Sequence, residues 1–119
     1  MAKILAIDDQ PDILTFVTST LGAEHRVSVT ESWITAVELI LKEHFDLILI
    51  DIKMPGLSGD KLADVLKKRI KDKPLNIVLF SGIEESELRE IAQEVGVTGY
   101  IHKPCDKNLF SLRIQRFLK

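Results

Sequence analysis

Five polar residues in this 119-residue sequence have the chemical types that handle a phosphoryl group. Three are the carboxylates of Asp8, Asp9 and Asp51, and the others are the hydroxyl of Ser81 and the ammonium of Lys103. Three carboxylates held close together repel one another unless a cation neutralises them, and oxygen ligands of this kind suit Mg²⁺ or Mn²⁺. Aspartate also forms covalent phosphoryl intermediates. If the five residues converge, they predict a metal-assisted site that holds a phosphoryl group on an aspartate.

Asp51 follows a run of four aliphatic residues, Leu47–Ile50, that predicts a strand buried on both faces. The sequence Met54-Pro55-Gly56 then predicts a turn. Ligands of open parallel sheets bind at the carboxyl ends of the strands, so Asp51 stands where such folds do chemistry. Taken alone, a solvated carboxylate at a strand end is the simpler explanation. The functional interpretation depends on the residues at the ends of the other strands.

The whole chain alternates strand-like and helix-like segments. The predicted strands are Lys3–Ile7, Arg26–Thr30, Leu47–Ile50, Ile77–Phe80 and Gly99–His102. The helix starts are marked by Pro11, Glu31-Ser32, Ser58-Gly59, Glu84-Glu85 and Asp106, and Gly96 ends the fourth helix. Strict alternation predicts an α/β protein with a doubly wound, five-stranded parallel sheet, right-handed crossovers and helices on both faces.

Apolar residues at helical spacing indicate which side chains face the core. In the second helix these positions are Ile34, Val37, Leu39, Ile40 and Leu41. In the third helix we expect Leu62, Val65, Leu66 and Ile70 to be buried. The last helix is built on Leu109, Phe110, Leu112, Ile114, Phe117 and Leu118.

The polar residues of interest come directly after four of the strands. Asp8 and Asp9 follow the first strand, Asp51 the third, Ser81 the fourth and Lys103 the fifth. In a doubly wound sheet the ends of these strands lie side by side at the topological switch point, so the five side chains are expected to meet. Thr30 and Glu31, after the second strand, are interpreted as structural.

Composition narrows the class of protein. The chain is long enough for one domain with its own core, which we assign to residues 1–119. The net charge of −2 disfavours direct binding to nucleic acid, because the phosphate backbone attracts basic surfaces. No apolar run predicts a membrane span and no secretory signal is evident, so we expect a cytoplasmic protein. The single cysteine, Cys105, excludes an internal disulfide and is expected to be a small buried hydrophobe.

Four motifs carry a resemblance to a known family. They are Asp8-Asp9 within Ile7–Asp12, Asp51 within Ile50–Gly56 with Gly59 after it, Phe80-Ser81-Gly82, and Gly99–Pro104. In this order and spacing they resemble the receiver domain of two-component response regulators, over essentially the whole chain. The resemblance implies a flavodoxin-like (βα)5 three-layer sandwich like that of the chemotaxis receiver. Its strand order, 2-1-3-4-5, is taken from the resemblance.

The resemblance also implies a role for each site residue. Asp51 would accept the phosphoryl group, and Asp9 and Asp51 would bind Mg²⁺ directly. Asp8 would act on the metal through water, and the backbone carbonyl of Lys53 would be a further ligand. Lys103 would pair with a phosphoryl oxygen. Ser81 would move to hydrogen-bond another oxygen, and Tyr100 would turn inward as it does so; the Lys103–Pro104 peptide is expected to be cis.

The function implied is that of a signalling switch, not of an enzyme acting on other substrates. The phosphoryl donor would be a sensor histidine kinase, a phosphotransfer protein or a small phosphodonor. Phosphorylation adds negative charge and would change the face made by the fourth helix, fifth strand and last helix, where an output protein binds. The fourth helix is acidic and the last helix basic, which would suit a homodimer, although two ordinary solvated faces explain the charges equally well.

Other functions on the same fold fit the residues less well. A flavodoxin-like cofactor binder needs free N–H groups after the first strand, where this chain has Asp8, Asp9, Gln10 and Pro11. A haloacid-type phosphatase needs a second Asp at position 53, where Lys53 stands. The sequence leaves open whether the chain is a stand-alone regulator or the receiver portion of a longer protein.

Ile83 lies two residues after Ser81 and offers no group to align an attacking water. We therefore predict a long-lived aspartyl phosphate. Trp33 stands at the start of the second helix, where it either contacts a partner or packs on the loop before the helix.

Overall fold

The computed structural model covers residues 1–119 and contains one parallel sheet of five strands. The strands are β1 (Lys3–Ile7), β2 (Arg26–Thr30), β3 (Leu47–Ile50), β4 (Ile77–Ser81) and β5 (Gly99–His102). Their order is β2-β1-β3-β4-β5, and every neighbouring pair is parallel. The predicted sheet and strand order are confirmed. β4 is one residue longer than expected, so Ser81 is its last residue and does not follow it.

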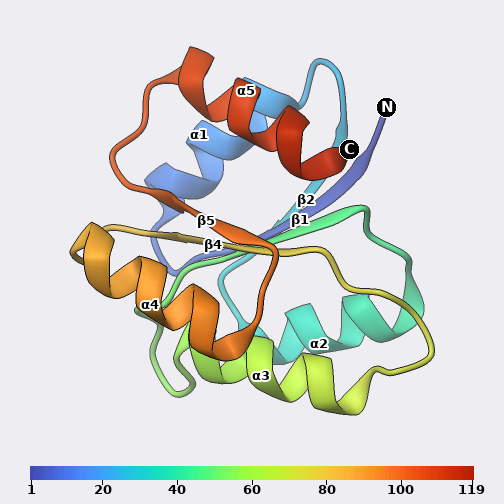
Figure 1. Ribbon diagram of the computed structural model, residues 1–119. Coiled ribbons are helices and arrows are strands. Elements are labelled where there is room, and N and C mark those ends of the chain that lie inside the picture. The colour runs from blue at the N-terminus through green and yellow to red at the C-terminus, as the bar shows by residue number, and fades with distance from the viewer.

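Five helices alternate with the strands and cover both faces of the sheet. They are α1 (Pro11–Leu21), α2 (Trp33–Lys42), α3 (Gly59–Arg69), α4 (Glu85–Val95) and α5 (Lys107–Leu118). Figure 1 shows α1 and α5 on one face and α2, α3 and α4 on the other, which is the predicted three-layer sandwich. No helix is long and apolar enough to cross a membrane.

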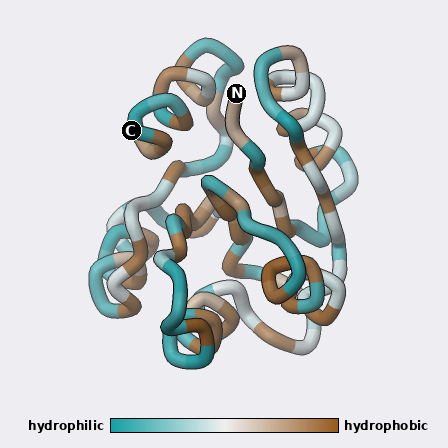
Figure 2. The backbone as a smooth tube through the Cα atoms, turned by 90° about the vertical axis from the view of Figure 1, so that its right-hand side faces the viewer, coloured by the Kyte–Doolittle hydropathy of each residue, from teal (hydrophilic) through white to brown (hydrophobic).

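The core consists of two apolar clusters, one on each face of the sheet. Successive residues of a strand point to opposite faces, so Ile48 and Ile50 pack toward α2–α4 while Leu47 and Leu49 pack toward α1 and α5. β3 is therefore buried on both sides, as its unbroken aliphatic run predicts. Figure 2 shows the hydrophobic parts of the tube concentrated between the helical layers and the hydrophilic parts on the outer turns.

The apolar faces predicted for three helices are wider than the faces that the structure buries. The residues that are predicted to face the core but are exposed are Ile34 and Leu41 of α2, Val65 of α3, and Leu109 and Leu112 of α5. α2 buries the predicted Ile40 together with Ala36, and α3 buries the predicted Leu62 and Leu66 together with Ala63. A helix that rests on a sheet presents only one stripe of side chains to it, and small residues close to the sheet take part of that stripe.

The helix ends follow the expected local chemistry. Asp106 caps α5, because its Oδ1 accepts a hydrogen bond from the backbone N–H of Leu109 at 3.0 Å. Ser32 caps α2 in the same way, through the N–H of Thr35 at 3.4 Å. Gly96 ends α4 in the left-handed region, with a φ of 77° that favours glycine.

Gly59, the first residue of α3, packs directly against the end of β3. Its backbone N–H donates to the carbonyl oxygen of Ile52 at 2.8 Å. A Cβ atom at this position would lie only 1.8 Å from the carbonyl oxygen of Asp51. α3 can therefore approach Asp51 this closely only because residue 59 has no side chain.

This close approach predicts that Gly59→Ala lowers the free energy of unfolding by about 3 kcal/mol, since the new methyl group must displace backbone at Asp51. Chemical denaturation of the two proteins measures the difference. Gly82→Ala is the matched control, because a Cβ there meets its nearest neighbour, Cβ of Lys103, at an ordinary 3.8 Å. Equal stabilities for Gly59→Ala and the wild type would contradict the packing described here.

Candidate phosphoryl-transfer site

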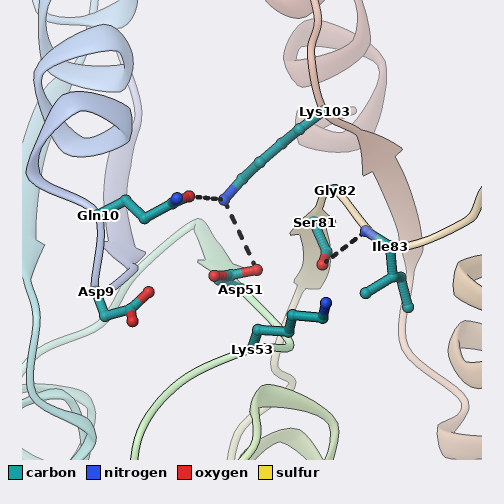
Figure 3. A pocket seen from close by; sticks show the side chains of 8 residues that line it. All are labelled: Asp9, Gln10, Asp51, Lys53, Ser81, Gly82, Ile83 and Lys103. Carbon is teal, nitrogen blue, oxygen red and sulfur yellow. Dashed lines mark hydrogen bonds and ion pairs between the residues drawn. The ribbon is translucent and has the colours of Figure 1, made fainter.

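A polar pocket of about 290 Å³ opens at the carboxyl end of the sheet. Its lining residues are Asp9, Gln10, Asp51, Lys53, Ser81, Gly82, Ile83 and Lys103. They come from the ends of β1, β3, β4 and β5 and the loops after them, as Figure 3 shows. The structure thus brings together the polar residues that the sequence places after these four strands.

Three carboxylates form an acidic cluster at this pocket. Asp8, Asp9 and Asp51 each place a carboxylate oxygen within 4.8 Å of the other two. Asp8 and Asp51 are buried, with 3% and 4% of their surface exposed, while Asp9 is half-buried. Burial raises the pKa of Asp51; the Lys103 ammonium lowers this pKa and the Asp8 carboxylate raises it further. A concentration of hard oxygen donors with more negative than positive charge fits a divalent cation such as Mg²⁺.

Lys103 is the cation closest to these carboxylates. Its Nζ lies 2.7 Å from Oδ2 of Asp8 and 3.7 Å from Oδ1 of Asp51, and only 10% of its side chain is exposed. It also lies 5.2 Å from the centre of the Phe80 ring, a cation–π contact. The Lys103 N–H donates to the Ser81 carbonyl at 2.8 Å, which fixes its backbone, and the peptide to Pro104 is cis as expected.

Ser81 lines the pocket, whereas Tyr100 lies outside it. Ser81 is buried, and its Oγ accepts a long hydrogen bond of 3.5 Å from the N–H of Ile83. The Tyr100 hydroxyl accepts from Nε of Arg89 and donates to Oε2 of Glu85, both at 3.2 Å. The structure therefore holds Tyr100 against the surface of α4.

The pocket also contains Gln10, for which the sequence predicts no role in the site. Its side-chain Oε1 accepts a hydrogen bond from Nζ of Lys103 at 3.3 Å. Phe80 belongs to a predicted strand and to one of the four motifs but is likewise given no role in the site, although its ring lies beside the same ammonium. The one available signal is position, because each residue is next in sequence to a site residue. The contacts that Gln10 and Phe80 make with Lys103 could not be inferred from their positions in the sequence.

The structure also shows the surroundings of Cys105 and Trp33, two residues outside the pocket for which the sequence makes predictions. Cys105 is half-buried, not fully buried as expected, and burial raises the pKa of its thiol. It packs at the margin of the cluster on the α1–α5 face because the loop after β5 runs along the surface. Trp33 is also half-buried and packs against the α2–α4 core, with its Nε1 beside Gly56.

Comparison with known proteins gives one consistent result. A family model described as the response regulator receiver domain matches residues 4–115. A probable cyclic di-GMP phosphodiesterase of Vibrio cholerae is 28% identical over 116 residues, which are 98% of this chain and 26% of that protein. The heme response regulator HssR of Staphylococcus aureus is 29% identical over 120 residues, covering all of this chain and 52% of HssR.

Solved structures agree with these matches. The chemotaxis response regulator CheY4 of Vibrio cholerae superposes with a TM-score of 0.88 and 28% identity, and 98% of each chain is covered. By contrast, this chain spans only about a quarter to a half of the curated relatives it matches. The shared unit is therefore the five-stranded sheet and its helices.

The raised pKa of Asp51 predicts how stability depends on pH when divalent metal is removed. Folding raises this pKa above its ordinary value of 3.8, so Asp51 stabilises the fold below about pH 4 and that contribution is lost as pH rises through the folded pKa. Asp51→Asn should therefore have a larger free energy of unfolding than wild type at pH 7 in EDTA. The difference should shrink toward pH 4.

Urea denaturation across this pH range measures the effect, and Asp12→Asn, at an exposed position, is the control. An Asp51→Asn protein less stable than wild type at pH 7 would show that the carboxylate's contacts outweigh its desolvation.

Proposed function

Because the chain belongs to the family of response regulator receiver domains, we propose that Asp51 is the residue that accepts the phosphoryl group. One observation carries this assignment. Asp51 is a buried carboxylate at the end of β3, it is clustered with two other carboxylates, and its Oδ1 lies 3.7 Å from the Lys103 ammonium. A nucleophile, a cation and a set of metal ligands thus share one pocket.

In the proposed reaction a carboxylate oxygen of Asp51 attacks the phosphorus of the donor. A new P–O bond forms, and the bond to the donor's leaving group breaks with its electron pair going to that group. Asp9, Asp51 and the Lys53 carbonyl would hold Mg²⁺, with Asp8 acting through water, and the bound ion would offset negative charge on the phosphoryl oxygens. Both oxygens of Asp8 are already engaged, by Lys103 and by the Gln10 N–H, which supports its indirect role.

Lys103 and Ser81 would stabilise the transferred group. The Lys103 ammonium is within reach of the Asp51 oxygens and neutralises charge that develops beside them. The Ser81 Oγ accepts a long hydrogen bond of 3.5 Å from the Ile83 N–H, and loss of this weak bond as the hydroxyl turns toward a phosphoryl oxygen would cost little.

The phosphorylated state would be recognised by a partner at the face formed by α4, β5 and α5. Reorientation of Ser81 at the end of β4 would alter the loop to α4, and Tyr100 of β5 would exchange its contacts with Glu85 and Arg89 for a position facing inward. Glu85 and Arg113 line one pocket between α4 and α5, so acidic and basic groups meet on this face. An output protein, or a second copy of the chain, would recognise it.

The phosphoryl donor would be a sensor histidine kinase, a phosphotransfer protein or a small phosphodonor. Residues 1–119 would act as one receiver domain whose only reaction is its own phosphorylation and dephosphorylation. A cofactor-binding function on the same fold is not supported, because the loop after β1 presents the carboxylates of Asp8 and Asp9 where a phosphate would need N–H donors.

Incubation with acetyl phosphate and Mg²⁺ should add one phosphoryl group to the wild-type protein, and Asp51→Asn should not react, because the nucleophile is lost. Intact-mass spectrometry measures the product. EDTA should prevent the gain in mass. Asp12→Asn, which changes an exposed carboxylate outside the pocket, should react like the wild type. A wild-type protein that gains no phosphoryl group would refute the proposed function.

The apolar character of Ile83 predicts that the phosphoryl group on Asp51 is hydrolysed slowly. Its apolar side chain lines the pocket and cannot orient a water molecule for attack on phosphorus. Ile83→Glu or Ile83→Asn should therefore lose phosphate severalfold faster than wild type, while Ile83→Val should not. Decay of the phosphorylated mass after removal of acetyl phosphate gives the rates. Equal rates for all four proteins would rule out this role.

A further inference from the structure

The start of α1, like the starts of α3 and α4, lacks the side-chain cap found at α2 and α5. Gln10 occupies the N-cap position with an extended backbone, but its side chain makes no hydrogen bond to the first turn. Ser32 and Asp106 do make such bonds at the starts of α2 and α5. Ser, Thr, Asp and Asn are favoured at this position because their short side chains reach the free N–H groups of the helix. The longer Gln10 side chain extends away from the first turn of α1 and hydrogen-bonds to Lys103.

That side chain points into the pocket and contacts Lys103, as the dashed line in Figure 3 shows. A lysine ammonium has three N–H donors and no acceptor. At Lys103 one donor is taken by Asp8 at 2.7 Å and a second by Oε1 of Gln10 at 3.3 Å. Asp51 lies 3.7 Å away, beyond hydrogen-bonding distance, so the ammonium has one donor left on that side.

Asp8 and Gln10 are also joined to each other. The Gln10 backbone N–H donates to Oδ1 of Asp8 at 3.0 Å, while Oδ2 of Asp8 accepts from Lys103. The ammonium is therefore held at two points on the α1 side of the pocket. Removal of the Gln10 acceptor would leave Asp8 as the one hydrogen-bond partner among these side chains, with Asp51 still 3.7 Å away, and would loosen the orientation of the ammonium.

We infer that Gln10 is a positioning residue that aims the Lys103 ammonium at the phosphoryl group on Asp51. The inference rests on the proposed function, because it concerns the same reaction. In this role the Gln10 side chain, at the N-cap position of α1, contacts Lys103 and does not cap the helix. A capping residue there would favour the helix and lose the contact with Lys103.

Two substitutions separate this role from a structural one. Gln10→Met keeps the length of the side chain but removes its hydrogen-bond acceptor. Gln10→Ser is too short to reach Lys103 but can cap α1, so it should raise the thermal midpoint of unfolding. Both variants should react with acetyl phosphate about 3- to 10-fold more slowly than wild type, the effect of one lost hydrogen bond. Gln115→Met, at an exposed position near the end of α5, is the matched control and should react at the wild-type rate.

The decisive result is a Gln10→Ser protein that is more stable than wild type and yet slower to be phosphorylated, since a merely structural role would not separate the two readouts. A wild-type rate in either Gln10 variant would overturn the inference while leaving the assignment of Asp51 intact. No phosphorylation of the wild type would instead refute the proposed function itself.

Discussion

Two buried carboxylates that share one lysine are the interaction on which the site depends. Asp8 and Asp51 are almost fully buried, and Lys103 is the ammonium that contacts both. Burial of unpaired charge is costly, so this cluster is tolerated only because the ends of β1, β3 and β5 are held in fixed positions around one cation. Asp9 adds a third carboxylate at the rim. The pocket carries more negative than positive charge, and that imbalance is compatible with the proposed divalent cation.

The scaffold keeps these groups together through the sheet order and one close backbone approach. The order β2-β1-β3-β4-β5 places β3 between the strands that supply Asp8 and Ser81, with β5 beside β4. α3 begins against the Asp51 carbonyl, where only glycine fits. The position of Asp51 is thus fixed from the strand before it and from the helix after it. Preorganisation of this kind is needed where charge must be stabilised without rearrangement.

Periodicity and strand-end chemistry were sufficient to predict the elements and most of the site. The aliphatic run before Asp51 specified a doubly buried strand, and the polar residues after four strands specified the pocket. The strand order came from family resemblance, because alternation alone does not determine it. Exposure of Ile34 and Val65 was not predictable, since helix orientation on the sheet depends on neighbours distant in sequence. The role of Gln10 was hidden for the same reason: its partner, Lys103, is 93 residues away.

The two ends of α4 are held in different ways, and this difference connects the pocket to the proposed output face. At the C-terminal end, Nζ of Lys67 donates to the carbonyls of Val95 and Gly96 at 2.9 and 2.6 Å, which binds α4 to α3. At the N-terminal end, α4 is joined to β5 by contacts between the side chains of Tyr100, Glu85 and Arg89. This N-terminal end comes directly after Ser81 and the loop through Ile83. In the proposed switch, a change at Asp51 would therefore reach α4 first at this end, through the loop that follows Ser81.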